Sequence, residues 1–331
     1  SRGDYGTLID AYPPFCRGKY PSPGGACYQR RGLPRTSPPP PLDPKLLRIE
    51  GVLVSHPVNS FTSMSAPTTV RWEHLRPDDF ISRLESCPVI YLPIGLCEPH
   101  GHIAPFGLDT LKADYYCDEA ARRFGGVVAP TQGYHIHECG FHRPWLDEVV
   151  GETNPRLGAM PPGVVCYHFL YQLRAFYNAG FRAVVVVSGH SGGSQNDLRT
   201  TAAAFTSATG LPVTVKSDPE WVEGLYEGDH AGKYEISQLL AIHPESIDMS
   251  LLDRQYDAGS GGRLALGEDA GEASKEYGHE INEAIINAIG DEVGRLNLSM
   301  SFDTKLDYEA TEKIWHELLS QNGEWFSEQG S

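Results

Sequence analysis

Residues 181–193 read FRAVVVVSGHSGG, and this stretch decides the fold class of the chain. Its first part, FRAVVVVS, is apolar on both alternating faces, as a strand must be when helices cover both sides of its sheet. An amphipathic helix is predicted just before it, over 164–179, and Gly180 is the residue that commonly ends a helix. A further helix is predicted over 196–209 and a strand over 211–216. Strand and helix therefore alternate, which is typical of a parallel sheet.

The same alternation extends over most of the chain. Further strands are expected over 88–95 and 126–130. Further helices are expected over 71–86, 109–124, 231–242, 276–289 and 308–319. Together these elements predict an α/β fold of three layers, α/β/α, with a mainly parallel sheet.

Composition divides the chain into three parts. Residues 1–65 are rich in Pro, Gly, Arg and Ser, so they cannot bury enough apolar surface to fold alone. We expect this N-terminal arm to be disordered or laid over a neighbouring subunit. Residues 66–300 form the predicted compact domain, and residues 301–331 form a helical C-terminal extension.

Charge and cysteine content narrow the class of protein. The 331 residues carry a formal net charge of −16, which argues against nucleic acid or an anionic membrane as the partner. No apolar run of about 18 residues predicts a transmembrane helix, and no signal peptide is visible. The seven cysteines are odd in number and form no C-x-x-C pair. This pattern favours reduced thiols and a cytoplasmic location.

Imidazoles and carboxylates follow the predicted strands, where parallel sheets bind their ligands. They are Glu98, His100, Asp109, His190, His230 and Glu235. Because the carboxyl ends of parallel strands meet at one edge of a sheet, we expect these side chains to lie together. A mixed set of this kind suits zinc, manganese or iron rather than calcium or magnesium.

Five of the thirteen histidines lie between positions 100 and 142. We expect substrate contacts from the loop 132–142, with Tyr134, His137 and His142 as candidates, and from Ser191 beside the strand-end histidine. The alternative is that these side chains only stabilise their loops.

A competing interpretation comes from the pattern G-x-S-x-G at 189–193, the nucleophile elbow of α/β-hydrolases. The pattern follows a strand and precedes a helix, as that motif requires. Ser191 would be the nucleophile of a serine hydrolase, with an acid such as Asp218 and with His230 as the base. This interpretation leaves the carboxylates and imidazoles of the first strand end unexplained.

Four blocks keep a consistent order over about residues 70–250. The first, LPIGLCEPHG at 92–101, matches L-P-x-G-x-x-E-x-H-G, and Asp109 is the second block, eleven residues after the glutamate. The third, AGFRAVVVVSGHSGG at 179–193, resembles G-F-R, an apolar strand and N-G-H-G-G-N, with Ser188 and Gly193 in place of the asparagines. The fourth, DHAGKYEISQLLAIHP at 229–244, resembles H-A-G-x-x-E-T-S-x-x-L-A-x-x-P. Together the blocks resemble the creatininase (creatinine amidohydrolase) family.

The resemblance implies one or two divalent ions per chain, zinc first and manganese or iron as alternatives. The implied ligands are Glu98, His100, Asp109, His190 and Glu235. Asp109 would bridge the two ions, His230 would be the general acid and base, and Glu235 would be a ligand or a base. The resemblance also implies that residues 66–300 are a catalytic domain. This domain would hydrolyse a small cyclic amide or related carbonyl compound with metal-activated water. Family members assemble as hexamers, so we expect a homo-oligomer.

One departure from the family pattern bears on the second ion. Gly192 stands where creatininase itself has a glutamate that completes the second metal position. The second ion therefore depends on Glu235 to supply the missing carboxylate, and creatinine itself is not the expected substrate. A family member that binds a small molecule without turnover is a third interpretation.

Overall fold

The computed structural model describes residues 69–137, 156–192, 195–262, 265–300 and 305–326. All of them belong to one unit, Ser63–Ser331. The predicted arm, residues 1–65, lies outside the described residues.

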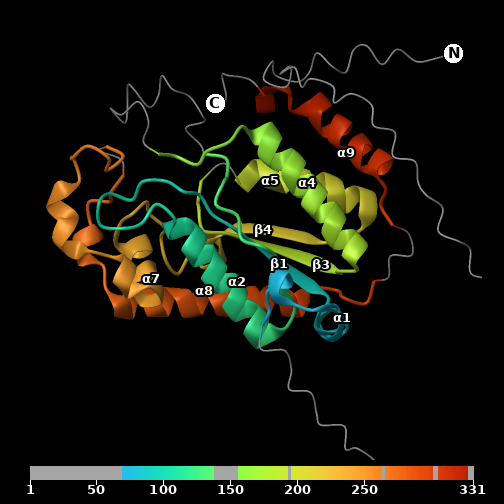
Figure 1. The fold of residues 1–331 in the computed structure, drawn as a ribbon, viewed down its shortest axis with the longest axis horizontal. Helices are drawn as coiled ribbons and strands as arrows, with labels where there is room; N and C mark the ends of the chain where they lie inside the picture. The colour runs from blue at the N-terminus through green and yellow to red at the C-terminus, as the bar shows by residue number, and fades with distance from the viewer. Residues whose placement is uncertain (1–68, 138–155, 193–194, 263–264, 301–304, 327–331) are drawn as a thin grey trace, which may run out of the picture. The chain divides into compact units, whose positions relative to one another are not determined.

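A parallel sheet forms the middle layer of this unit (Figure 1). Its strands are β1 (Val89–Ile94), β2 (Val127–Val128), β3 (Ala183–Ser188) and β4 (Val213–Ser217), in the order β2-β1-β3-β4. Every neighbouring pair is parallel. β1 and β3 pair along their full length, so that Ile94 and Ser188 end side by side. The predicted parallel sheet is confirmed.

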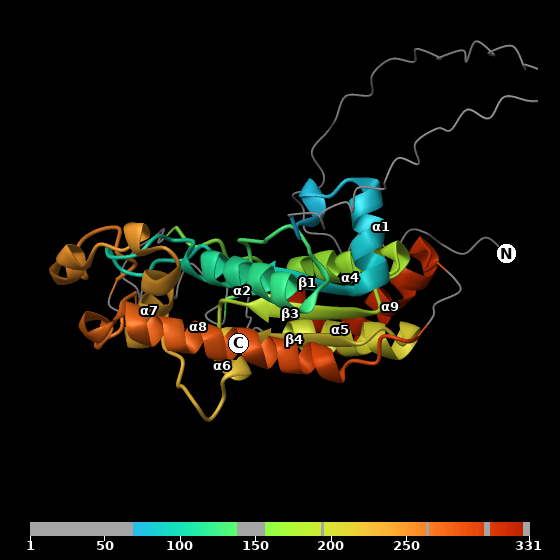
Figure 2. The ribbon, with the colours of Figure 1, turned by 90° about the horizontal axis from the view of Figure 1, so that it is seen from below.

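Helices cover both faces of the sheet, as Figures 1 and 2 show. One face carries α4 (Pro162–Ala179), α5 (Gln195–Thr209) and α9 (Tyr308–Gln321), and the other carries α2 (Leu108–Phe124) and α8 (Lys275–Arg295). The short α6 (Asp218–Trp221) follows β4, and α7 (Lys233–Ile242) packs on α8. The three-layer α/β/α architecture is therefore confirmed.

A hydrophobic core lies on each face of the sheet, because the pleat of the strands directs successive side chains to opposite faces. Leu92 and Val186 point into the core beneath α4 and α5, while Tyr91 and Val185 point into the core against α2 and α8. All four side chains are fully buried. This explains why the strands are apolar at successive positions rather than at alternate ones.

The helix predicted over 71–86 is interrupted. Trp72–His74 forms a short 3-10 turn, and α1 begins only at Pro77 and ends at Ser86. A proline disfavours the helical conformation at the residue before it, and Arg76 is extended, with ψ of 160°. The strand predicted over 126–130 is also shorter than expected: only β2, Val127–Val128, pairs with β1 as a strand.

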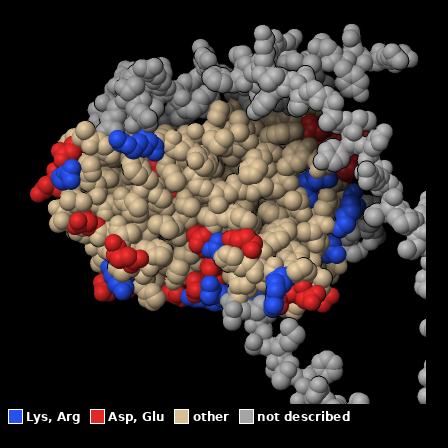
Figure 3. Space-filling model, viewed as in Figure 1, with Lys and Arg blue, Asp and Glu red and all other residues tan. Residues whose placement is uncertain are grey.

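Most charged side chains on the face seen in Figure 3 lie toward its edges, and one mixed group of acidic and basic side chains lies below the centre. The area above that group is largely uncharged. None of the helices within the described ranges is long and apolar enough to cross a bilayer.

The C-terminal extension contributes to the core beneath α4 and α5. In α9, Ile314, Trp315 and Leu318 are buried, and the Trp315 ring lies 4.9 Å from the ring of Tyr167 in α4. Within the predicted extension 301–331, the described helix α9 therefore packs against α4 and α5, on the same face of the sheet.

Trp315→Ala should lower the free energy of unfolding by about 3–5 kcal/mol, because it leaves a cavity under α9. His316→Ala is the matched control, since this neighbour is exposed and should change stability by less than about 0.5 kcal/mol. Urea unfolding of both variants gives the comparison. Equal stabilities would show that α9 does not stabilise the domain.

Candidate metal centre

Side chains from four segments meet at the carboxyl edge of the sheet. Glu98 and His100 follow β1, His190 follows β3, Asp109 lies in the first turn of α2, and Glu235 lies in the first turn of α7. All five are buried, with at most 5% of each residue exposed. The structure thus brings together the residues that the sequence analysis selected at separate strand ends.

Two glycines allow α2 to approach the strand ends this closely. A Cβ on Gly189 would lie 2.0 Å from the backbone oxygen of Asp109, and a Cβ on Gly95 would lie 2.3 Å from the backbone nitrogen of Thr110. Gly189 also donates its N–H to Ile94 at 2.9 Å. Any side chain at either glycine would push Asp109 away from the edge of the sheet.

The turn before α7 presents His230 and Glu235. Ala231 adopts the left-handed conformation, with φ of 49°, and donates its N–H to Oε2 of Glu235 at 2.8 Å. The carboxylate of Asp229 accepts backbone N–H groups from the first turn of α7. The helix start predicted at 231 is therefore wrong, and α7 begins at Lys233.

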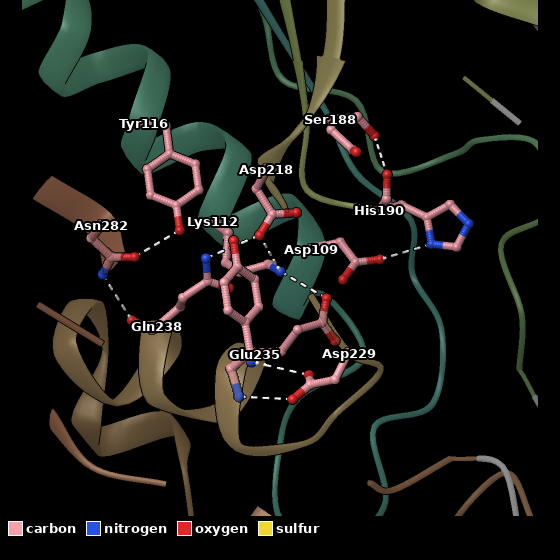
Figure 4. A network of polar contacts seen from close by, with 12 residues as sticks. Asp109, Lys112, Tyr116, Ser188, His190, Asp218, Asp229, Glu235, Gln238 and Asn282 are labelled. Carbon is pink, nitrogen blue, oxygen red and sulfur yellow. Dashed lines mark hydrogen bonds and ion pairs between the residues drawn. The ribbon is translucent and has the colours of Figure 1, made fainter. Parts of the chain in front are cut away.

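Glu98, Asp109 and His190 form a first set of donors whose ligand atoms lie within 4.8 Å of one another. Nδ1 of His190 lies 2.8 Å from Oε1 of Glu98 and 3.5 Å from Oδ2 of Asp109. Figure 4 shows His190 and Asp109 facing each other from β3 and α2. Two carboxylates and one imidazole are a suitable donor set for zinc, manganese or iron.

His100, Asp109 and Glu235 form a second set of donors of the same size. Nε2 of His100 lies 3.3 Å from Oδ1 of Asp109 and 3.7 Å from Oε2 of Glu235. Asp109 therefore belongs to both sets and directs one oxygen toward each. A carboxylate shared in this way has the arrangement of a bridging ligand.

Three buried atoms of this cluster lack a hydrogen-bond partner among the described residues: Nε2 of His100 and both carboxylate oxygens of Asp109. Nδ1 of His100 is satisfied, because it donates to the backbone oxygen of Glu98 at 3.0 Å. The tautomer with the proton on Nδ1 leaves a lone pair on Nε2, which is the usual arrangement of a metal-bound histidine. The residues present therefore fit a divalent ion.

His230 lies at the open side of the cluster, with 38% of its side chain exposed. Its Nε2 donates to the backbone oxygen of Pro99 at 3.2 Å, and its Nδ1 lies 3.9 Å from Oε1 of Glu98. Its ring stacks on His100 with the ring centres 4.9 Å apart. The imidazole of His230 is accessible to solvent, whereas the other five side chains of the cluster are buried.

The electrostatics of the cluster favour a bound cation. Burial opposes the charge on Glu98, but the imidazoles of His190, His137 and His230 outweigh it and hold the pKa of Glu98 well below its usual range. Burial likewise opposes protonation of His100, yet Asp109 and Glu235 raise the pKa of His100 to about 9. The site therefore attracts a proton when no other cation is present, and a metal ion would compete for the same place.

The predicted substrate contacts are only partly brought together. His137 lies 3.4 Å from Oε2 of Glu98 and stacks on His190, whereas Tyr134 is 66% exposed. Ser191 is half-buried beside His190. His142 lies outside the described residues.

The serine-hydrolase interpretation finds no support in the contacts. Within the described parts of the chain, no hydrogen bond joins any two of Ser191, Asp218 and His230. Oδ2 of Asp218 instead accepts hydrogen bonds from Lys112 and Gln238, at 3.2 and 3.0 Å. The expectation that Asp218 orients His230 is therefore not met.

Lys112 is the residue that the sequence analysis missed. Its side chain is fully buried, and its Nζ lies 2.8 Å from Oε1 of Glu235 and 3.2 Å from Oδ2 of Asp218. The spacing of three residues from Asp109 places both on one face of α2, and this could have indicated it. Burial raises the pKa of Asp218 to about 6, against the opposite effect of Lys112.

The fold and the site define an α/β protein with a buried carboxylate–imidazole cluster at the carboxyl edge of its sheet. The family model for creatininase (creatinine amidohydrolase) matches residues 73–293. This chain belongs to the creatininase family.

Two relatives and several solved structures are similar to this chain. The creatinine amidohydrolase of Pseudomonas putida is 28% identical over 192 residues, which cover 51% of this chain and 68% of the relative. The 3-dehydro-scyllo-inosose hydrolase of Thermotoga maritima is 26% identical over 200 residues, 55% of this chain and 59% of the relative. A creatininase crystal structure matches with a TM-score of 0.57 at 22% identity, covering 69% of this chain and 98% of that one. Other creatininase structures with this fold include a manganese form and a mutant of Zn–Zn type.

Gly189→Ala should lower the free energy of unfolding by at least about 1–3 kcal/mol, because the new Cβ collides with the backbone of Asp109. Gly107→Ala, at the start of the same helix, is the control, since a Cβ there meets nothing within 4 Å. Urea unfolding in the presence of a chelator measures the packing effect without any metal contribution. If both alanines are tolerated equally, the close approach of α2 to β3 is not a constraint.

Proposed function

We propose that this protein is a metal-dependent hydrolase with two ion positions that share Asp109. The observation that supports it best is the pair of buried Asp109 oxygens, both without a hydrogen-bond partner in the described residues. Each oxygen faces an imidazole, His190 on one side and His100 on the other. The imidazoles lie 3.5 and 3.3 Å from these oxygens and make no hydrogen bond to them, so a cation between these groups accounts for the arrangement.

Zinc is the ion we favour, with manganese or iron as alternatives, because the donors are imidazoles and carboxylates. The first position would be held by Glu98, Asp109 and His190, and the second by His100, Asp109 and Glu235. Creatininase structures of manganese and Zn–Zn forms agree with this choice of metals. An ion held by these residues would supply a Lewis acid that activates water and polarises a substrate carbonyl.

His230 is the proposed general acid and base. Because its Nε2–H donates to Pro99, the lone pair lies on Nδ1, which faces Glu98 and the open side of the cluster. Nδ1 can take a proton from the attacking water and return it to the leaving group. An imidazole suits this role near neutral pH.

The proposed substrate is a small cyclic amide or a related carbonyl compound. The two relatives are named for hydrolysis of creatinine and of an inosose, both small ring compounds. Gly192 in place of the creatininase glutamate disfavours creatinine itself. His137 and Ser191, with Tyr134 further out, are the proposed substrate contacts.

The other interpretations receive less support. A serine hydrolase would need Ser191 to be activated by His230, but no hydrogen bond joins these two side chains in the described parts of the chain. A binding protein without turnover would follow from the missing carboxylate at Gly192, but Glu235 offers a carboxylate at the same cluster. We retain a homo-oligomer, a hexamer by family resemblance, as part of the proposal.

Asp109→Asn should remove most of the metal from the purified protein, because one substitution weakens both positions. Elemental analysis after gel filtration should give one or two equivalents of zinc, manganese or iron for the wild type. Glu119→Gln, on the same helix and paired with Arg123 at the surface, should keep the wild-type content. A full complement of metal in Asp109→Asn would contradict the shared position. Wild-type protein that takes up no metal would overturn the proposed function and give Ser191 priority.

His230→Ala should keep the metal content but lose about 10²- to 10⁴-fold in kcat, the usual contribution of a general acid and base. Turnover is measured on whichever compound responds in a screen of cyclic amides, formamides and cyclic ketones. His243→Ala, at the other end of α7 and exposed, is the control. Unchanged kcat in His230→Ala would assign proton transfer to another group.

A further inference from the structure

Lys112 is a buried cation one turn beyond Asp109 on α2. None of its surface is exposed, and it lies between two carboxylates, Oε1 of Glu235 at 2.8 Å and Oδ2 of Asp218 at 3.2 Å (Figure 4). Among the described lysines and arginines, Lys112 alone is buried. A side chain this costly to bury needs an explanation beyond stability, since an apolar residue of similar volume is often equally stabilising at such a place.

The contacts of Glu235 divide its two oxygens between different tasks. Oε1 accepts from Lys112, whereas Oε2 accepts the N–H of Ala231 at 2.8 Å and lies 3.7 Å from Nε2 of His100. The carboxylate therefore cannot rotate without breaking a hydrogen bond at either end. It presents Oε2 to His100 while Oε1 is held by Lys112.

The ammonium group of Lys112 is itself held in place. Oδ2 of Asp218, at the start of α6, also accepts from the side chain of Gln238 at 3.0 Å. The backbone oxygen of Gln238 accepts from Asn282 in α8, and Asn282 accepts from Tyr116, which lies one turn beyond Lys112 on α2. Figure 4 shows this chain of buried contacts, which ties α2, α6, α7 and α8 together. Asp218, itself held by this chain of contacts, therefore fixes the ammonium group of Lys112 on the side away from Glu235.

We propose that Lys112 is a positioning residue that holds Glu235 as a single-oxygen ligand of the second metal position. This inference rests on the proposed function, and it assigns Lys112 to one of the two positions. The first position, with Glu98 and His190, has no hydrogen bond or ion pair to Lys112 in the described structure. Loss of Lys112 therefore affects the second ion selectively, whereas loss of the shared Asp109 affects both.

A merely structural role for Lys112 leads to a different expectation. Lys112→Met alone leaves Asp218 buried without its cation and can unfold the protein. The double variant Lys112→Met/Asp218→Asn replaces both charges by neutral side chains of similar shape, which removes this problem at Asp218, while Glu235 keeps the N–H of Ala231 and the imidazole of His100. If Lys112 serves only packing, the double variant folds and binds both ions as the wild type does.

The test is titration of chelator-treated protein with Mn²⁺, followed by electron paramagnetic resonance and elemental analysis. We expect the wild type to bind two ions with the spectrum of a coupled pair. The double variant should bind the second ion about 10- to 100-fold more weakly, the usual effect of losing a group that orients a ligand, and show isolated Mn²⁺ at one equivalent. Asp218→Asn alone should keep the pair, because the contact between Lys112 and Glu235 remains.

Arg123→Met is the matched control. Arg123 of α2 also bridges two carboxylates, Glu119 of the same helix at 3.0 Å and Glu283 of α8 at 2.7 Å, but it does so at the surface. This variant should keep both ions at wild-type affinity. A double variant that binds two ions as tightly as the wild type, or that loses both equally while circular dichroism shows it folded, overturns the role of Lys112 alone. Wild-type protein that binds no Mn²⁺ overturns both this inference and the proposed function.

Discussion

The buried carboxylate of Asp109 is the group on which the rest of the site depends. Its oxygens face His190 and His100, at 3.5 and 3.3 Å, and neither has a hydrogen-bond partner among the described residues. Each of these two imidazoles also lies beside a second carboxylate, His190 beside Glu98 and His100 beside Glu235. A divalent ion bound by both sets of donors would take the place that protons on these imidazoles otherwise occupy. The pKa of Glu98 is held low and that of His100 is raised by this close approach of carboxylates and imidazoles.

The backbone near Asp109 is as constrained as its side chain. The pairing of Ile94 with Ser188 ends β1 and β3 at the same level, so the loops that follow present their side chains to one space. Gly95 and Gly189 come directly after these strands and leave room for the first turn of α2. The glycines of the two sequence blocks are thereby explained as packing requirements of α2.

Much of this arrangement could be predicted from the sequence, because it follows from elements that are strongly periodic. The apolar strand at 181–188 and its flanking helices fix a parallel sheet, and parallel strand ends meet at one edge. Contacts between helices were harder to predict. In the serine-hydrolase interpretation Asp218 is the acid of a catalytic triad. In the structure Asp218 lies beside Lys112, which belongs to a helix far away in sequence. No local pattern reports that α2 and α6 approach each other, since this depends on how both helices pack against the sheet and α8.

The position of Glu235 links these observations. The loop after β3 carries Gly192, which is exposed and has φ of 119°, so it offers no carboxylate to the second set of donors. The carboxylate in this set belongs to Glu235 of α7, which lies on the buried side next to α2. Lys112 pairs with it from the same helix that carries Asp109. Helix α2 therefore carries both the carboxylate shared by the two sets of donors and the ammonium group that pairs with Glu235. Its close fit against Gly95 and Gly189 places both groups at once, so the whole centre depends on the position of one helix.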